Sequence, residues 1–395
     1  MSINPPLNTS GTLNTGSTAA EPVTEAAEEV HTAYTLADAK PPLDEELLKV
    51  ENLTVEFPTD DGAVKAVRGV SYTLHAREVL GIVGESGSGK SVSSMALMGL
   101  LPKSARISGS ITYRGQDLLS MRPAQQRALR GEKIAMIFQD PMTSLNPVHS
   151  VGDQLAEAVL AHHLVPRKQA LGRAKEMLDM VGIPQADKRL RAYPHEFSGG
   201  MRQRVMIAMA IINNPDVIIA DEPTTALDVT VQAQILEKLL EVKDAVNAAI
   251  LMITHDLGVI AGMAHKTLVM YAGKSVEVGD TDHIFYEPQM PYTAGLLGSI
   301  PSLEGETDSR LRPITGTPPS LIHLPRGCPF SPRCPLATDV CEESEPDLAG
   351  VGEGHWAACH HSDKLAEAED PTAFFRADPE TAPPVGAGTE SEEGR

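Results

Sequence analysis

Four short segments predict strands: Val79–Val83, the KIAMIFQ segment that ends at Gln139, Val217–Ala220 and Ile250–Thr254. The last two are continuously apolar, which is expected of strands buried in a sheet that helices cover, because such strands need no polar alternation. A different pattern, with apolar residues at alternate positions, occurs in the LTVEF segment at residues 53–57 and is typical of a half-buried strand. Together these patterns predict an α/β fold.

Apolar residues at intervals of three and four predict amphipathic helices between Gln139 and Ser198. The two stripes consist of Val151, Leu155 and Val159, and of Leu171, Ala174, Leu178 and Val181. Another helix is predicted after the first buried strand, and Pro102 prevents it from continuing.

Composition and charge narrow the function classes. Hydrophobic residues make up 42% of the 395 positions but aromatic residues only 4%, so the core must be mostly aliphatic. A net charge of −20 argues against a protein whose main task is to grip a nucleic-acid backbone. The N-terminus lacks an export signal, and no run approaches the roughly 20 apolar residues of a membrane helix, so we expect a soluble cytosolic chain.

The strongest local motif is GESGSGKS at Gly84–Ser91, which follows the strand Val79–Val83 and matches the phosphate-binding pattern G-x-x-x-x-G-K-[ST]. Its glycines let successive N–H groups converge on phosphate oxygens. Lys90 is expected to reach the β- and γ-phosphates and Ser91 to bind Mg²⁺; the alternative is a glycine-rich turn with a chance lysine. The predicted nucleotide-binding residues of this segment are Gly84, Glu85, Ser86, Gly87, Ser88, Gly89, Lys90, Ser91 and Val92.

Two acids and a histidine follow the later buried strands. Asp221 is expected to hold Mg²⁺ through water, and Glu222 to polarise the attacking water. The alternative, that both acids merely cap a helix, is less favoured because they lie between a buried strand and Pro223. His255 ends the last strand, at the sheet edge where ligands of doubly wound folds bind, although a lone histidine is more often structural.

The segment Ser198-Gly199-Gly200-Met201-Arg202-Gln203 resembles the signature of the nucleotide-binding subunits of ATP-binding-cassette (ABC) transporters, with Phe197 in place of the usual Leu. The resemblance implies two domains that face head to tail, with ATP between the P-loop of one and the signature of the other. The residues that would serve the partner's ATP are Ser198, Gly199, Gly200, Met201, Gln203 and Asp228.

The same resemblance assigns further roles. It makes Gln139 a ligand of the Mg²⁺ and water site and the link to a transmembrane partner, and His255 a contact of the γ-phosphate. Ala226-Leu227-Asp228 resembles the D-loop. Phe57 lies where the family stacks an aromatic ring on adenine, or is a core phenylalanine. An antiparallel β subdomain and an inserted helical subdomain at about residues 141–200 are also implied.

Longer phrases, including DEPTTALDVTVQAQIL and PYTAGLLGSIP, are similar to the ATPase subunits of di- and oligopeptide importers, whose relatives carry nickel. One departure is Met290, where that subfamily usually has His. The resemblance implies ATP hydrolysis at the cytoplasmic face of the membrane, with a second and paralogous ATPase, two permeases and an extracytoplasmic solute-binding protein as partners. The alternatives are an importer of nickel or another small solute, a soluble non-transport ABC ATPase, and a redox-sensing module.

All four cysteines, Cys328, Cys334, Cys341 and Cys359, lie near the C-terminus. In a reducing cytosol such a cluster favours metal ligation over disulfides. The spacing has no C-x2-C pair, which suits a [4Fe–4S] cluster, and the subfamily resemblance also points to iron–sulfur. Zinc, with His355 or His360 replacing a cysteine, is the second interpretation, and a disulfide pair the third.

These observations predict four regions. They are an acidic disordered tail at 1–45, the ATPase domain at 46–288, the cysteine-containing extension at 289–361 and a second acidic disordered tail at 362–395.

Overall fold

The computed structural model describes residues 45–225, 227–300 and 314–375, all within one compact unit, Pro42–Arg395. Nearly all of the predicted N-terminal tail and the last 20 residues therefore lie outside the described residues.

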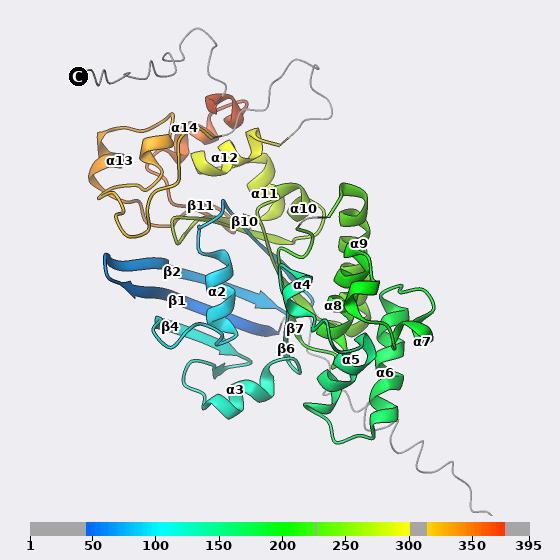
Figure 1. Ribbon diagram of the computed structural model, residues 1–395. Coiled ribbons are helices and arrows are strands. Elements are labelled where there is room, and N and C mark those ends of the chain that lie inside the picture. Colours follow the sequence, from blue (N-terminus) through cyan, green and yellow to red (C-terminus); the bar gives the residue numbers. More distant parts are fainter. Residues whose placement is uncertain (1–44, 226, 301–313, 376–395) are drawn as a thin grey trace, which may run out of the picture. The chain divides into compact units, whose positions relative to one another are not determined.

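The strands form two sheets (Figure 1). One is antiparallel and has the order β2-β1-β4-β5, and the larger one has the order β11-β12-β10-β9-β3-β8-β7-β6. The bounds are β1 Glu46–Thr59, β2 Gly62–His75, β3 Val79–Val83, β4 Arg106–Tyr113, β5 Gln116–Asp117, β6 Ile134–Ile137, β7 Val217–Asp221, β8 Ala249–Thr254, β9 Lys266–Tyr271, β10 Lys274–Asp280, β11 Ala349–Gly352 and β12 His355–Ala357.

The helices follow and separate these strands. Their bounds are α2 Lys90–Leu97, α3 Pro123–Leu129, α4 Pro141–Ser144, α5 Val151–Leu160, α6 Arg167–Met180, α7 Ala186–Arg189, α8 Gly199–Ile211, α9 Val229–Val246, α10 Leu257–Ala261, α11 Thr281–Tyr286, α12 Pro291–Gly298, α13 Asp339–Glu343 and α14 Ser362–Ala366. Short 3₁₀ turns are η1 Pro194–Glu196, η2 Ser331–Arg333 and η3 Pro371–Phe375.

The four strands predicted first are β3, β6, β7 and β8, and they pair in parallel in the order β3-β8-β7-β6. Every residue of these strands is buried, which confirms the prediction made for β7 and β8. Parallel pairing brings their carboxyl ends to one edge, so the segments that leave these ends can form one site.

The predicted half-buried strand is part of β1, which pairs with β2 and β4 in the antiparallel sheet. Leu53 and Val55 of that segment are fully buried, whereas Phe57 is only partly buried against the core. The core between the two sheets consists mainly of Leu, Ile and Val side chains, which agrees with the low aromatic content.

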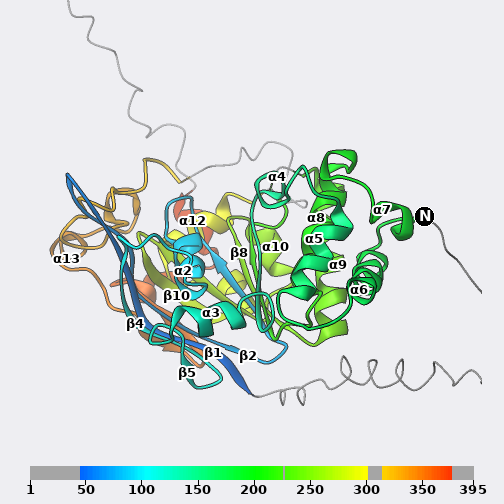
Figure 2. The same cartoon turned by 60° about the horizontal axis from the view of Figure 1, so that its bottom comes forward.

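Helices α5 to α8 gather beside β6 and β7 in Figure 1, and Figure 2 shows the same four helices together at one side of the molecule. The predicted stripe Val151, Leu155 and Val159 is fully buried on α5. On α6, Ala174 and Leu178 are buried as expected, and Met177 joins them.

Three predicted boundaries differ from the structure. The strand predicted to end at Gln139 ends at Ile137 as β6, because the chain leaves the buried sheet there and Phe138 and Gln139 are exposed. Helix α2 ends at Leu97 rather than at Pro102, because Gly99 adopts the left-handed conformation (φ 58°) that commonly terminates helices. The C-terminal tail predicted from residue 362 begins with α14 and η3. Apolar residues explain this order: Leu365 is buried, and the Phe375 ring lies 6.4 Å from that of Phe330.

Candidate functional site

The glycine-rich loop after β3 has a backbone that only glycine can adopt at two positions. Gly84 and Gly89 have φ values of 152° and 100°. A Cβ atom on Gly84 would lie 2.2 Å from the Met270 carbonyl oxygen, and one on Gly89 would lie 2.3 Å from the Ala66 carbonyl oxygen. The loop then enters α2, so its backbone N–H groups and the positive end of the helix form an anion-binding site.

Lys90 lies at the start of α2 and is 5% exposed. Its Nζ donates hydrogen bonds to the carbonyl oxygens of Gly84 (2.7 Å) and Glu85 (3.0 Å). Burial lowers the pKa of Lys90, while the nearby carboxylates of Glu222, Asp221 and Glu85 oppose that change. A phosphate could take the place of these carbonyl oxygens, because it is the stronger partner for a buried ammonium group.

Ser91 and Asp221 form the predicted metal-binding pair. The Ser91 hydroxyl donates to Oδ1 of Asp221 at 2.9 Å, and Asp221 is 4% exposed. Burial raises the pKa of Asp221, and the hydrogen bond from Ser91 opposes the rise. Hydroxyl and carboxylate oxygens suit Mg²⁺, which takes few protein ligands and completes its shell with phosphate and water. In the described part of the chain, no group of three or more His, Cys, Asp or Glu side chains could hold a metal ion by itself.

Glu222 brings three other residues together. Its Oε2 accepts hydrogen bonds from Nε2 of Gln139 and from the hydroxyl of Thr225, both at 2.9 Å. Its Oε1 lies 3.3 Å from Nδ1 of His255. Sequence reasoning predicted Gln139 and His255 here but missed Thr225, which carries no motif of its own.

The backbone of Glu222 explains how its side chain reaches this point. Its φ of 47° is unusual for a residue other than glycine, and its N–H donates to the Ile253 carbonyl at 2.8 Å. Strained conformations of this kind are typical of functional positions. The turn directs the Glu222 carboxylate toward residues that leave β6 and β8.

The signature segment starts α8. Ser198 caps the helix and accepts a hydrogen bond from the Met201 N–H at 3.4 Å, while Ser198 and Gly199 are exposed. A Cβ on Gly200 would lie 2.7 Å from Cγ1 of Val231 on α9, so a larger residue would separate the two helices. Gln203 is buried, and its Nε2 has no hydrogen-bond partner among the described residues.

The remaining predicted nucleotide residues lie elsewhere. Asp228 caps α9 and accepts from the Val231 N–H at 3.0 Å. Ala226 lies outside the described residues. Phe57 packs partly on the core of the antiparallel sheet, so its alternative role as a core residue agrees with its position.

The four cysteines line one small cavity, together with Met290, Phe330, His360 and His361. All four are free thiols, so the disulfide interpretation is wrong for this structure. The pKa of Cys334 is raised to about 11 and that of Cys359 to about 12, mainly by burial and in part by the neighbouring cysteines. A bound cationic group would stabilise the thiolate forms of cysteines that line one cavity.

His355 does not belong to this cavity, contrary to its suggested role as a zinc ligand. Its Nε2 lies 2.9 Å from Oε1 of the buried Glu277 on β10, so the ring is already engaged. His360 does line the cavity, but its Nε2 lies 3.0 Å from the Ser344 carbonyl oxygen.

The segment around Met290 contacts both the cysteine cavity and the P-loop. Met290 precedes α12, is 2% exposed and lines the cysteine cavity. Two residues later, the Tyr292 hydroxyl accepts a hydrogen bond from the Glu85 N–H of the P-loop at 2.8 Å. This contact joins the region after the ATPase motifs to the phosphate cradle.

The sheet order, the glycine-rich loop and the Asp221-Glu222 pair define a P-loop ATPase of the ABC class. The oligopeptide transport ATP-binding protein OppD of Salmonella typhimurium is 53% identical over 313 residues, which cover 79% of this chain and 93% of that protein. The chain belongs to the family of oligopeptide and dipeptide transport ATP-binding proteins.

Other comparisons agree. The family described as ABC transporter matches residues 67–225, and the oligopeptide/dipeptide transporter C-terminal region matches residues 276–341. The dipeptide transport ATP-binding protein DppD of Bacillus subtilis is 51% identical over 325 residues, covering 82% of this chain and 97% of that protein.

Solved structures share the fold. The cbiO1 protein from Clostridium perfringens, part of the ABC transporter complex cbiONQ, has a TM-score of 0.53 and 28% identity, covering 62% of this chain and 92% of that one. The ATP-binding cassette MJ0796, in a dimeric structure bound to ADP and Pi, has a TM-score of 0.53 and 24% identity, covering 60% of this chain and 99% of that one.

Within the described ranges, no helix is both long and apolar enough to span a membrane.

Proposed function

We propose that this chain is the ATP-hydrolysing subunit of a membrane importer for di- or oligopeptides. The observation that carries the proposal is the convergence of Gln139, Thr225 and His255 on Glu222, at the sheet edge that also holds the P-loop. The names of relatives that share about half of its residues support peptides as the substrate.

In the proposed reaction, a water molecule attacks the γ-phosphorus of ATP in line with the bond to the β-phosphate. The new P–O bond forms as the bridging bond breaks, giving ADP and phosphate. Glu222 orients the water and takes up its proton, while Gln139 and His255 hold the Glu222 carboxylate in place. Lys90 balances the phosphate charge. Mg²⁺, held by Ser91 and Asp221, would neutralise the phosphate oxygens.

We propose that ATP is sandwiched between two such subunits. The exposed Ser198 and Gly199 at the start of α8 form an anion-binding helix end that one chain's own P-loop does not require. The dimeric MJ0796 structure supports this arrangement by its fold. The second subunit would be a paralogue, as the peptide-importer resemblance implies.

The permease would bind beside the helical subdomain at about residues 141–200, which we propose consists of α4 to α7, and beside the following helix α8. A cavity of about 620 Å³ lies between these helices and the sheet, and its lining includes the apolar Leu100, Phe138, Met206 and Met209. Phe138 precedes Gln139, so a permease segment in this cavity could influence the catalytic carboxylate through one residue. The subunit would thus act at the cytoplasmic face of the membrane, where two permeases and an extracytoplasmic binding protein complete the importer.

We propose that the cysteine cavity in the extension at 289–361 holds a [4Fe–4S] cluster. Four free thiols line one cavity, which matches the four ligands of such a cluster. Within the described residues, no group of three or more His, Cys, Asp or Glu side chains is arranged to hold a metal ion, so the proposal rests on the shared cavity and the subfamily resemblance, and zinc is the second candidate. The ATPase domain would then span residues 46–288.

The test is reconstitution of the chain with its permeases and second ATPase in vesicles. Peptide-loaded binding protein should stimulate ATP hydrolysis and peptide uptake. Uptake of nickel but not of peptide would favour the related alternative, and ATP hydrolysis that ignores the permeases would favour a non-transport ATPase.

A further inference from the structure

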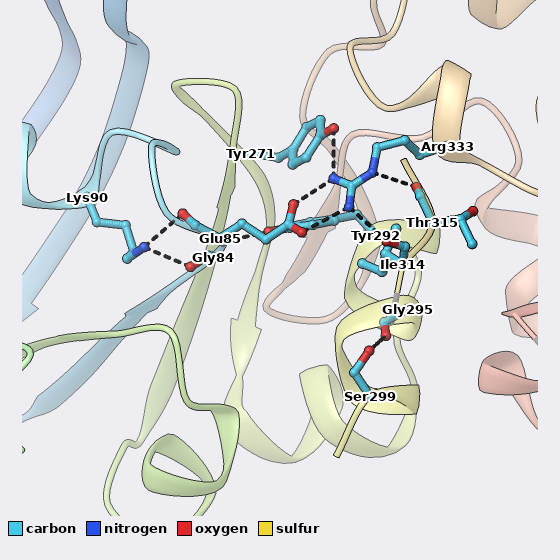
Figure 3. Close-up of polar contacts among 10 residues, drawn as sticks. All are labelled: Gly84, Glu85, Lys90, Tyr271, Tyr292, Gly295, Ser299, Ile314, Thr315 and Arg333. Carbon is cyan, nitrogen blue, oxygen red and sulfur yellow. Dashed lines mark hydrogen bonds and ion pairs between the residues drawn. The ribbon is translucent and has the colours of Figure 1, made fainter. Parts of the chain in front are cut away.

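Arg333 of η2 reaches from the cysteine-containing extension to the P-loop. Its side chain is 4% exposed, and its two terminal nitrogens donate to the two carboxylate oxygens of Glu85, at 2.6 and 2.9 Å (Figure 3). This two-pronged geometry is the strongest form of a guanidinium–carboxylate pair. The pair joins positions 248 residues apart in the chain.

The rest of the guanidinium group is also fixed. Nε donates to the Thr315 carbonyl at 3.0 Å, and Nη2 donates to the Ile314 carbonyl at 3.2 Å. Nη1 also donates to the Tyr271 hydroxyl at 3.3 Å. Figure 3 shows the guanidinium group between these partners and Glu85. Because so many partners set its direction, Arg333 can fix the Glu85 side chain in one orientation.

The backbone of Glu85 is held at the same time. Its N–H donates to the Tyr292 hydroxyl of α12 at 2.8 Å, and its carbonyl accepts from Nζ of Lys90 at 3.0 Å. The second residue of the phosphate cradle is therefore anchored through both its side chain and its main chain. Two of its three anchors, Arg333 and Tyr292, follow the ATPase motifs in the chain.

The charge of Glu85 gives this anchoring a functional meaning. A carboxylate in a loop that binds a triphosphate repels the ligand, and it would do so strongly in a partly buried site. Arg333 neutralises this charge and prevents the Glu85 carboxylate from rotating freely. Tyr271, which accepts a hydrogen bond from Arg333, is neutral and cannot compensate the charge of Glu85.

We propose that Arg333 is a positioning residue for ATP binding, which holds and neutralises Glu85 so that the P-loop can accept the nucleotide phosphates. The inference rests on the proposed function, because it takes ATP as the ligand of the P-loop. It assigns the C-terminal extension a direct part in the nucleotide site, beyond its cysteine cavity.

The test measures binding of MgATP to the full-length chain by titration calorimetry. R333Q should raise the Kd about tenfold, because one uncompensated negative charge then faces the phosphates. The double variant E85Q/R333Q should return to within about twofold of the unmodified chain, since the repelling carboxylate is gone. R333K, which keeps the charge but loses the fork, should lie between them.

The controls separate positioning from folding. R326Q changes an exposed arginine of the same extension and should leave the Kd unchanged. In the assembled transporter, R333Q should raise the KM for ATP while kcat at saturating ATP stays within about twofold.

An R333Q variant that binds MgATP as tightly as the unmodified chain would overturn the proposal. So would a double variant as weak as R333Q alone, because Arg333 would then only support the fold. Failure of the unmodified chain to bind MgATP would instead refute the proposed function itself.

Discussion

His355 and Glu277 face each other inside the protein, with Nε2 of the histidine 2.9 Å from Oε1 of the carboxylate. The Glu277 side chain is fully buried, and its Oε1 also accepts from the Gln289 N–H at 2.6 Å. Its Oε2 has no partner among the described residues. The pair joins β12 of the extension to β10 of the large sheet.

H355A should therefore lower the free energy of unfolding by about 3 kcal/mol, because it leaves a buried carboxylate without its side-chain partner. Chemical denaturation of the full-length chain measures the loss. H323A, at an exposed position of the same extension, is the matched control and should change stability little. A loss below about 1 kcal/mol in H355A would mean that water or rearrangement compensates the carboxylate.

E222Q should preserve MgATP binding but lower ATP turnover by about 10²- to 10⁴-fold, the range expected when a general base is removed. Turnover is measured in the assembled transporter, and E237Q on an exposed part of α9 is the control. Near-normal hydrolysis in E222Q would remove Glu222 from its proposed role.

G199D and K90A should separate the two nucleotide surfaces. Asp at position 199 places a negative charge at the exposed start of α8, so it should block hydrolysis but leave the subunit's own MgATP affinity nearly intact. K90A should weaken the subunit's own binding. Equal losses of affinity in isolated G199D and K90A chains would contradict the shared site.

L100D should prevent association with the permeases while MgATP binding persists, because it places a charge in the apolar cavity beside Phe138. Leu100 is 43% exposed, so the variant should fold. Co-purification with the permeases measures the effect. The control is L164D, which changes a fully exposed leucine outside the cavity; equal association of both variants would argue against docking there.

Chain purified without oxygen should contain about four iron and four acid-labile sulfide atoms per molecule, the content of one cubane cluster. C341S should lose both, because it removes one of the four cavity thiols. Metal analysis with absorption spectroscopy decides between the candidates. Stoichiometric zinc without sulfide would replace iron–sulfur with zinc, and the absence of both metals would reject a metal at this site.

Features that follow directly from buried strands could be predicted from the sequence. Asp221 ends β7, while Glu222 and His255 each follow the last residue of a strand, so parallel pairing of β7 and β8 is enough to bring them to one edge. Long-range polar contacts could not be predicted in this way. Arg333 and Glu85 carry no shared periodicity, and their pairing depends on how the extension folds back onto the P-loop.

Two features could not be predicted from the residue types alone: the end of α2 and the partner of His355. Pro102 was a visible helix breaker, but the left-handed Gly99 ends α2 earlier, because a glycine reveals its conformation only in the folded chain. Histidine is a common metal ligand, but the buried Glu277 already contacts Nε2 of His355.

The short hairpin of β11 and β12 continues the large sheet beyond β10. Glu277 and Val278 pair with Ala357 and Trp356, and the Ala358 N–H donates to the Val276 carbonyl at 2.8 Å. Without this hairpin, β10 would present unpaired N–H and C=O groups to solvent, and exposed strand edges of this kind recruit strands from other molecules. A chain truncated after α12 would therefore be prone to aggregation even with every ATPase motif intact.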